Sequence, residues 1–289
     1  PDPHVSADDD GSVHLVDDDA GGRGEFDRKH VDSDQPLRRL ALRQRQLDRT
    51  GILHDRRPLA ASRVDALLVG DSAAMVMHGH DTTIPADLDM MCLHTAAARR
   101  GAPDKLLIAD MPFLAHRKSL VHTMGAVERL VRAGGQAVKL EGADGNLEAI
   151  RHIVDSGIDV MGHLGLTPQS LHRLGGYKVQ GRNGQAAAKL ADDARYLQDA
   201  GCFSIVLELV PSELARTVTE SLQIPTIGIG AGPHTSGQVL VLQDLLGLQP
   251  DFQPKFLRTF LDGFELLRGA LDRFDQAVKE GSYPSSEES

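Results

Sequence analysis

The sequence predicts an α/β protein, and within that class a (β/α)8 TIM barrel whose first strand is not recognisable. From Val64 onward short aliphatic runs alternate with helical patterns, which is the sequence form of βα units around a parallel sheet. Three predicted helices end in a glycine that the next aliphatic run follows, at Gly134, Gly157 and Gly201. Polar residues follow almost every run, as expected where the C-terminal ends of the barrel strands surround one common site. A doubly wound sheet, the competing architecture, would gather them in one crevice.

Seven aliphatic runs are the predicted strands. Each is nearly continuous, because a strand of a parallel sheet is covered on both faces. The runs are VDALLVGD (64–71), KLLIADMP (105–112), QAVKLEG (136–142), IDVMGHLG (158–165), FSIVLELVP (203–211), IPTIGIGAG (224–232) and GQVLVLQD (237–244). A barrel needs eight strands, so the missing one is expected before Val64, where the sequence is arginine-rich.

Helical patterns lie between these strands. They cover residues 86–100, 120–133, 145–156, 185–200 and 213–223. Ser119, Asp144 and Ser212 are the expected N-caps of three of these helices, because a short polar side chain can accept from the free backbone N–H groups of the first turn. The order of strand, helix, glycine and strand is most simply explained by repeated βα units with short turns.

The first 63 residues differ in composition from the rest of the chain. Residues 1–35 hold acidic runs among Gly, Ser and His and few apolar residues, which predicts a disordered acidic segment. Residues 36–63 are arginine-rich and contain no strand-like run. We therefore predict three parts: the acidic segment, an atypical segment over 36–63 in place of the first βα unit, and a catalytic barrel over 64–289 with a C-terminal helix and a short tail.

Composition narrows the classes of function. The 289 residues carry a formal net charge of −10, which argues against a protein that neutralises nucleic-acid phosphates. No run of about 18 apolar residues is present, so a membrane span is excluded. Cys92 and Cys202 lie far apart, so neither a disulfide framework nor a structural zinc site is expected, and a reducing cytoplasm is the expected compartment. A small-molecule enzyme is the favoured class.

Four acidic residues end, or nearly end, predicted strands: Asp71, Asp110, Glu141 and Glu208. In a barrel these ends converge, and converging carboxylates repel unless a cation neutralises them or they share protons. Oxygen ligands with spare positions for water and substrate suit Mg²⁺. The alternative is that each acid caps the next helix or pairs with an arginine. That alternative is a good explanation for any one acid taken alone. It is a poor explanation for four acids on four separate strands.

Three further polar residues lie near these acids. Lys139 is two residues before Glu141, so both project to the same face of the strand, and an inward lysine is costly unless it meets an anion. The hydroxyl of Ser72 either holds a substrate carboxylate or begins a loop, and the pattern favours neither. A histidine at a strand end, such as His163, is more often a structural residue than a functional one.

Two other motifs resemble known binding sites, but the residues around them do not support binding. His78 and His80 form an H-x-H pattern, but no third histidine is nearby in the sequence, so a transition-metal site is not expected. GIGAG (228–232) lacks both the Lys-Ser/Thr of a P-loop and the spacing of a dinucleotide fingerprint. Its glycines are better explained by a ligand or a backbone segment that approaches closely.

Several segments resemble one enzyme family, in unbroken order from Val64 to about Pro284. They are VGDSAAMVMHGHDTT (69–83), HTAAARRGAP (94–103), LLIADMPF (106–113), AVKLEG (137–142), GHLGLTPQS (162–170), GGYKVQGR (175–182), LELVPSELA (207–215), IPTIGIGAG (224–232) and VKEGSYP (278–284). With these motifs the chain resembles the ketopantoate hydroxymethyltransferase family, also called 3-methyl-2-oxobutanoate hydroxymethyltransferase. GHLGLTPQS followed by GGYKVQGR is the most specific part of the resemblance.

The resemblance implies a (β/α)8 barrel, a Mg²⁺ cofactor and a cytoplasmic homo-oligomer, which is a decamer in bacterial members. It implies transfer of a one-carbon unit from 5,10-methylenetetrahydrofolate to 3-methyl-2-oxobutanoate, giving 2-dehydropantoate on the route to pantothenate. The implied substrate-binding residues are Asp71, Ser72, Asp110, Lys139 and His163. The implied metal-site acids are Asp71, Asp110 and Glu141. Glu208 matches the general base that removes the proton at C3 of the keto acid.

The segment before Val64 departs from the family pattern. Family members begin with a strand that ends in Thr-Ala-Tyr-Asp, and nothing between Pro36 and Arg63 reproduces it. We therefore expect an out-of-frame or misassigned gene start there. Two alternatives to an active enzyme stay open. One is an inactive or unstable chain of the same family that lacks its first strand. The other is a related Mg²⁺-dependent α-keto-acid lyase or mutase barrel, a class with a catalytic-cysteine loop that this sequence lacks.

Overall fold

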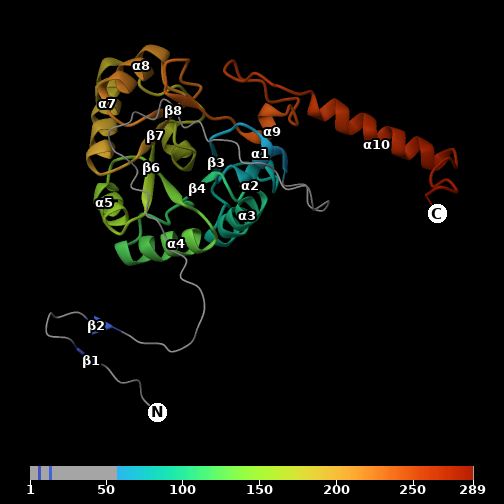
Figure 1. Ribbon diagram of the computed structural model, residues 1–289. Helices are drawn as coiled ribbons and strands as arrows, with labels where there is room; N and C mark the ends of the chain where they lie inside the picture. Colours follow the sequence, from blue (N-terminus) through green and yellow to red (C-terminus); the bar gives the residue numbers. More distant parts are fainter. Residues whose placement is uncertain (1–5, 8–12, 15–56, 289) are drawn as a thin grey trace. The chain divides into compact units, whose positions relative to one another are not determined.

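The computed structural model describes residues 6–7, 13–14 and 57–288 of the chain (Figure 1). The chain divides into two units, residues 1–43 and 44–289. In the first unit β1 (Ser6–Ala7) pairs antiparallel with β2 (Val13–His14). Most of the predicted acidic segment and most of the arginine-rich segment lie outside the described residues. Their boundaries therefore stay predictions.

A curled sheet of seven parallel strands forms the centre of the second unit (Figure 1). Along the sheet the strands follow their order in the chain, β3-β4-β5-β6-β7-β8-β9. They are β3 (Ala66–Val69), β4 (Leu106–Asp110), β5 (Ala137–Glu141), β6 (Asp159–Gly165), β7 (Ser204–Glu208), β8 (Thr226–Ile229) and β9 (Gly237–Gln238). This order is that of a barrel, whereas a doubly wound sheet reverses at a switch point. The predicted fold class is confirmed, and no eighth parallel strand occurs within residues 57–288.

Helices connect the strands and surround the sheet (Figure 1). The longer ones are α3 (Leu88–Gly101), α4 (Leu120–Arg132), α5 (Leu147–Asp155), α7 (Gly184–Asp199), α8 (Ser212–Ser221) and α10 (Gly263–Lys279). The shorter ones are α1 (Arg57–Ala61), α2 (Ala73–Val76), the 3₁₀ turn η1 (Pro168–Ser170), α6 (Leu171–Leu174) and α9 (Leu242–Leu245). Over the described part of the chain, the helices are too short or too polar to cross a bilayer.

Aliphatic side chains fill the space between the sheet and the helices. Leu140 of β5 and Ile205 of β7 pack in one core cluster with Leu130, Ile150 and Leu197 from the surrounding helices. Burial of such side chains is favourable by about 25 cal/mol per Å² of apolar surface. Because both faces of the sheet are covered, its strands read as unbroken aliphatic runs. The rigid sheet fixes the positions of the residues at the strand ends.

The predicted helix caps are partly confirmed. The Ser119 hydroxyl accepts from the His122 backbone N–H at 3.2 Å and caps α4, as predicted. The prediction of Asp144 as a cap is wrong, because the chain turns at Gly145, whose φ is +72°, and α5 begins only after Asn146. Ser212 is also not a cap, since it is already the first residue of α8.

The last predicted strand is mostly wrong. Of the run over 237–244, Gly237–Gln238 forms β9 and Leu242 begins α9. A short aliphatic run does not by itself distinguish a strand from a helix, because both can be buried on all sides. Here Asp244 lies inside α9, where its Oδ1 accepts from Gln249 Nε2 at 3.1 Å.

Candidate active site

The sheet brings the predicted site residues together. Asp110 and Glu208 are the last residues of β4 and β7, and Asp71 follows β3 after one residue. The parallel register places Asp110 beside Lys139, and Glu141 beside His163. All but Glu208 of these six residues are buried. Ser72, the seventh, follows Asp71 and is half-buried at the start of α2.

Lys139 lies in the middle of this cluster. Its Nζ is 3.0 Å from Asp110 Oδ1 and 3.2 Å from His163 Nδ1. Burial alone would lower the pKa of Lys139, but the nearby carboxylates outweigh it and raise the pKa above its ordinary value. The lysine therefore stays charged, and the inward side chain that the sequence indicates has an anionic partner in Asp110.

His163 lies between two carboxylates. Its Nδ1 is 3.5 Å from Glu141 Oε1 and its Nε2 is 3.2 Å from Glu208 Oε2. Burial and Lys139 lower the pKa of His163, but the two carboxylates outweigh them and raise it to about 9. The imidazole is therefore protonated at neutral pH and links β5 to β7. A purely structural histidine does not explain this position between two acids.

The three buried acids differ in their electrostatics. Burial, followed by the charges of Asp110 and Glu141, raises the pKa of Asp71 to about 7. Burial also raises the pKa of Asp110, although Lys139 opposes it. Burial acts in the same direction on Glu141, but His163 and Lys139 outweigh it, so the pKa of Glu141 is lowered. Full ionisation of all three acids is thus unfavourable, and a bound cation or shared protons would relieve their repulsion.

The donor set fits a divalent cation. Four acidic side chains face two basic ones, Lys139 and His163, and after burial it is repulsion from neighbouring acids that raises the pKa of Asp71. Asp110 Oδ1 lies 3.0 Å from Lys139 Nζ, and Glu141 Oε1 lies 3.5 Å from His163 Nδ1. Within the described residues no three His, Cys, Asp or Glu side chains enclose a metal by themselves. Mg²⁺ does not need such an enclosure, because it usually takes one or two carboxylates together with water and substrate.

Two amide side chains that the sequence reasoning missed support the acids. Gln169, in η1 after β6, donates from Nε2 to Asp71 Oδ2 and to the Met111 carbonyl, each at 2.9 Å. Asn146 is buried and donates from Nδ2 to the carbonyl oxygens of Glu141 and Gly142, each at 2.8 Å. Gln169 lies inside GHLGLTPQS, so the signal in the sequence was the motif and not the residue type.

The histidines of the H-x-H pattern do not face each other. His78 Nε2 lies 2.8 Å from the Nε2 of His94, a residue of α3, and the two rings meet edge-on. One of the two rings must be neutral to accept the hydrogen bond. Burial, and then the charge of His78, lowers the pKa of His94. The pair lies among exposed residues and includes none of the acids described above.

The backbone around Glu208 is closely packed. Gly165, the last residue of β6, has a φ of +91°, and a Cβ at this position would overlap the carbonyl oxygen of Glu208. Leu166 donates from its N–H to that same oxygen at 2.8 Å. Leu209, the next residue after Glu208, has a φ of +46°, which is uncommon for a residue with a side chain. Strained backbone of this kind is concentrated at functional sites.

Comparison with solved structures supports the fold. The chain is similar to phosphonopyruvate hydrolase in complex with oxalate and Mg²⁺, with a TM-score of 0.52, 10% identity, and coverage of 81% of this chain and 84% of that chain. It is also similar to oxaloacetate acetylhydrolase in complex with 3,3-difluorooxalacetate, with a TM-score of 0.50, 15% identity, and coverage of 80% and 90%. At these identities the likeness shows the fold alone.

Comparison of sequences identifies the family. The family model described as ketopantoate hydroxymethyltransferase matches residues 57–286. The 3-methyl-2-oxobutanoate hydroxymethyltransferase of Coxiella burnetii (strain Dugway 5J108-111) is 61% identical over 230 residues, which are 79% of this chain and 86% of that protein. The protein of the same name from Bdellovibrio bacteriovorus is 57% identical over 233 residues, 81% of this chain and 89% of that protein. The chain therefore belongs to the ketopantoate hydroxymethyltransferase family.

Proposed function

We propose that the chain transfers the one-carbon unit of 5,10-methylenetetrahydrofolate, as a hydroxymethyl group whose oxygen comes from water, to 3-methyl-2-oxobutanoate. The products are 2-dehydropantoate, for pantothenate biosynthesis, and tetrahydrofolate. The observation that carries this proposal is the gathering of the residues with family-motif matches in one cluster of strand ends. That cluster has four acidic side chains and a buried lysine. It thus provides groups for holding a cation, an anionic keto acid and a proton.

Asp71, Asp110 and Glu141 are the residues that would hold Mg²⁺. The closeness of these acids, which together with burial raises the pKa of Asp71, supports this role, because a divalent cation would relieve their repulsion. A bound Mg²⁺ supplies Lewis-acid stabilisation of the negative charge that develops on the keto oxygen when the C3 proton leaves. The protein contributes the orientation of the three acids, which the sheet and the hydrogen bonds to their other oxygens fix.

Lys139 and Ser72, together with Asp71, form the proposed carboxylate subsite, and Asp110 is a further proposed substrate contact. The buried ammonium of Lys139 is the positive group that an α-keto acid would meet. Ser72 follows Asp71 as the N-cap residue of α2, and its hydroxyl makes no cap hydrogen bond, so in this proposal it donates to the substrate carboxylate. A substrate held at two points loses its rotational freedom before reaction, which lowers the barrier of the step that follows.

Glu208 is the proposed general base. Its side chain is 19% exposed, so it lies at the accessible edge of an otherwise buried cluster. His163 Nε2 lies 3.2 Å from Glu208 Oε2 and holds the carboxylate in place. An oriented carboxylate near C3 removes the proton and can return it after the new carbon–carbon bond has formed. His163, which lies between Glu141 and Glu208, is the remaining proposed substrate contact.

Exchange of the C3 proton tests this mechanism without the folate. The full chain, incubated with 3-methyl-2-oxobutanoate and Mg²⁺ in D₂O, is expected to replace the C3 proton by deuterium, as followed by proton NMR. Removal of Mg²⁺ with EDTA is expected to stop the exchange, and added Mg²⁺ to restore it. The same slow rate with enzyme, with EDTA and without protein would overturn the proposal and favour the inactive chain considered above.

We also propose a homo-oligomer, formed through α10. Gly263 is the single buried residue of this helix, which lies apart from the helices around the sheet (Figure 1). Five of its large apolar residues follow a spacing of three and four, typical of two paired helices. They are Phe264, Leu267, Leu271, Phe274 and Val278. Most of the stability of a helix in a protein comes from packing of its apolar face, so this face needs a partner.

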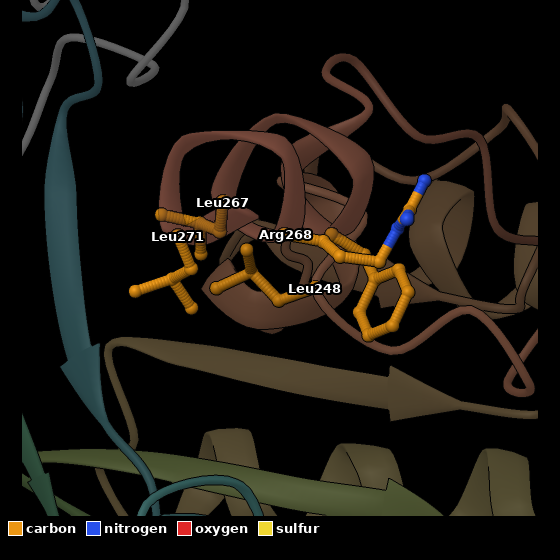
Figure 2. A pocket seen from close by; sticks show the side chains of 5 residues that line it. Leu248, Leu267, Arg268 and Leu271 are labelled. Carbon is orange, nitrogen blue, oxygen red and sulfur yellow. The ribbon is translucent and has the colours of Figure 1, made fainter. Parts of the chain in front are cut away.

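The groove beside α10 is apolar and open (Figure 2). It has a volume of about 360 Å³ and is lined by Leu248, Phe264, Leu267, Arg268 and Leu271. With the segment before α10, ten large apolar side chains are between 37% and 69% exposed. They are Phe252, Phe256, Phe260, Leu261, Phe264, Leu266, Leu267, Leu271, Phe274 and Val278.

The occupant that fits this surface is a second copy of the chain. A covered aromatic side chain buries roughly 150–250 Å², so ten half-exposed large side chains, five of them phenylalanine, offer on the order of 800 Å², which a stable interface needs from each partner. The charged residues of α10 balance, with three acidic and three basic side chains. They form ion pairs along the helix, such as Arg268 with Asp272 and Lys279 with Asp275. Two copies therefore meet without net repulsion.

Substitution of the apolar stripe tests the interface. The double variant Leu267→Asp, Leu271→Asp is expected to sediment as a monomer in analytical ultracentrifugation, whereas the unchanged chain sediments as an oligomer. Val121→Asp changes an exposed apolar side chain of α4 and is the matched control, expected to leave the oligomer intact. A monomeric unchanged chain, or a double variant that still assembles, would contradict the proposal.

We further propose that the chain works in the cytoplasm. Cys92 and Cys202 are both free thiols. Burial raises the pKa of Cys202 to about 12, so this thiol is protonated and unreactive. Free cysteines are typical of a reducing compartment, and the proposed reaction uses small intracellular metabolites.

A further inference from the structure

Gln169 connects residues from four strands of the candidate site. It is the second residue of η1, which follows β6, and its side chain reaches Asp71 beyond β3 and Met111 beyond β4. Its backbone N–H donates to Oε2 of Glu141, the last residue of β5, at 3.1 Å. Asp71 and Glu141 are not on adjacent strands, because β4 lies between β3 and β5. The sheet ladder therefore cannot set their mutual orientation, and Gln169 contacts both.

The orientation of the Gln169 amide follows from its partners. Asp71 Oδ2 and the Met111 carbonyl are both acceptors, and each lies 2.9 Å from Nε2. A flipped amide would place its own oxygen against two acceptors, so only the observed orientation satisfies them. Both donors of the side-chain NH₂ group are then in use. Pro168 at the first position of η1 limits the backbone and helps to keep the side chain in this place.

Each buried acid has one oxygen held by an N–H group. Gln169 Nε2 holds Oδ2 of Asp71, and Gln169 N holds Oε2 of Glu141. The Asp71 N–H holds Oδ2 of Asp110 at 3.1 Å. Oδ1 of Asp110 and Oε1 of Glu141 instead lie near basic groups, Lys139 Nζ at 3.0 Å and His163 Nδ1 at 3.5 Å. The held oxygens fix the direction in which the other oxygen of each carboxylate points.

We propose that Gln169 is a positioning residue that sets the affinity of the site for a divalent cation by orienting the carboxylate of Asp71. This inference rests on the proposed function, which assigns Asp71 to the cation site. A hydrogen bond to a ligand carboxylate keeps the ligand in the charged form and in one orientation, and loss of such a bond typically weakens metal affinity 10–100-fold. Gln169 itself does not contact the substrate or the cation in this account.

Mn²⁺ binding to the full chain tests the role directly. Free Mn²⁺ is measured by electron paramagnetic resonance, with no substrate present, for the unchanged chain and for Gln169→Met. Methionine has a similar length and keeps the backbone N–H to Glu141 but has no side-chain donor. Its Mn²⁺ dissociation constant is expected to rise 10–100-fold. Gln169→Asn, which is one methylene too short to reach Asp71, carries the same expectation if the methionine variant does not fold.

Gln198→Met is the matched control. Gln198 lies near the end of α7, and its Oε1 accepts from the backbone N–H of Gln223 at 2.7 Å. Its loss is expected to lower the melting temperature and to leave the Mn²⁺ dissociation constant within twofold of the unchanged chain. An equal loss of affinity in Gln198→Met and Gln169→Met would show a general effect of stability and would overturn the inference.

A double-mutant cycle separates positioning from structural support. If Gln169 acts through Asp71, then Gln169→Met has almost no further effect on Mn²⁺ affinity once Asp71 is replaced by asparagine. The same 10–100-fold loss in both backgrounds would overturn the inference. Unchanged Mn²⁺ affinity in Gln169→Met, with C3 exchange present in the unchanged chain, would overturn the role of Gln169 alone. Absence of Mn²⁺ binding in the unchanged chain would overturn the proposed cation site as well.

Discussion

Glu208→Gln is expected to slow the exchange of the C3 proton of 3-methyl-2-oxobutanoate by about 10²–10⁴-fold, because a glutamine of the same shape cannot accept the proton. Glu208 ends β7 and is the most exposed of the four acids, and His163 Nε2 lies 3.2 Å from its Oε2. The substitution keeps the packing around Gly165 and Leu209. Proton NMR in D₂O with saturating Mg²⁺ measures the exchange rate.

Mn²⁺ binding and a control variant distinguish the loss of the general base from damage to the whole site. Mn²⁺ affinity of Glu208→Gln is expected to stay close to that of the unchanged chain, since the proposed cation ligands are Asp71, Asp110 and Glu141. Glu213→Gln is the matched control. Glu213 lies in the first turn of α8, where its carboxylate is 3.4 Å from Arg216, and its replacement is expected to leave the exchange rate unchanged. Exchange at the full rate in Glu208→Gln would rule out Glu208 as the base.

Lys139→Met is expected to lower the free energy of unfolding by about 3–5 kcal/mol at pH 8, the cost typical of a buried ion pair that loses one partner. The lysine lies 3.0 Å from Asp110 Oδ1, and both side chains are buried. Methionine fills a similar volume but leaves the carboxylates without their central cation. Urea unfolding monitored by circular dichroism, without divalent cations, measures the difference.

The loss is expected to shrink at acidic pH. Burial already raises the pKa of Asp110, and without the opposing charge of Lys139 it rises further in the folded state. A carboxyl group whose folded pKa lies above its unfolded pKa favours the folded state below the unfolded pKa, and this contribution is lost as pH rises through the folded pKa. Lys139→Met is therefore closest to the unchanged chain at low pH and furthest from it above neutral pH.

Lys189→Met provides the comparison for an exposed ion pair. Lys189 Nζ lies 3.0 Å from Asp144 and 2.8 Å from Asp193, and it is half-exposed. Such pairs contribute only about 0–1 kcal/mol, so this variant is expected to change the unfolding free energy little and without strong dependence on pH. If Lys139→Met lowered the unfolding free energy by less than about 1 kcal/mol, and equally at pH 8 and at acidic pH, the account of the buried cluster would be contradicted.

The strands and the acids at their ends could be predicted from the sequence because each depends on a local pattern. Unbroken aliphatic runs gave β3 to β8 to within a few residues, and the polar residue after each run placed Asp71, Asp110, Glu141 and Glu208 at one edge. The order of the strands then followed from the parallel βα repeat. What these patterns could not supply was any distance across the sheet.

Other features depend on contacts between distant segments. Gln169 is 98 residues from Asp71 in the chain, and nothing in its neighbours indicates that its amide contacts that carboxylate. The cap of α7 was missed because Asn183, which accepts from the Ala186 N–H at 2.8 Å, lies in a polar stretch with several possible starts. His163 reads as structural by residue type, and only the register with Glu141 and the contact with Glu208 show its place between two acids.

Formation of 2-dehydropantoate tests the central claim most directly. The full chain is incubated with 3-methyl-2-oxobutanoate, Mg²⁺ and 5,10-methylenetetrahydrofolate carrying carbon-13 at the methylene position, and the products are followed by carbon-13 NMR. We predict that the label moves into a hydroxymethyl group of 2-dehydropantoate at a rate that depends on both Mg²⁺ and Glu208. Label that stays on the folate, in a folded chain that binds Mn²⁺, would contradict the account.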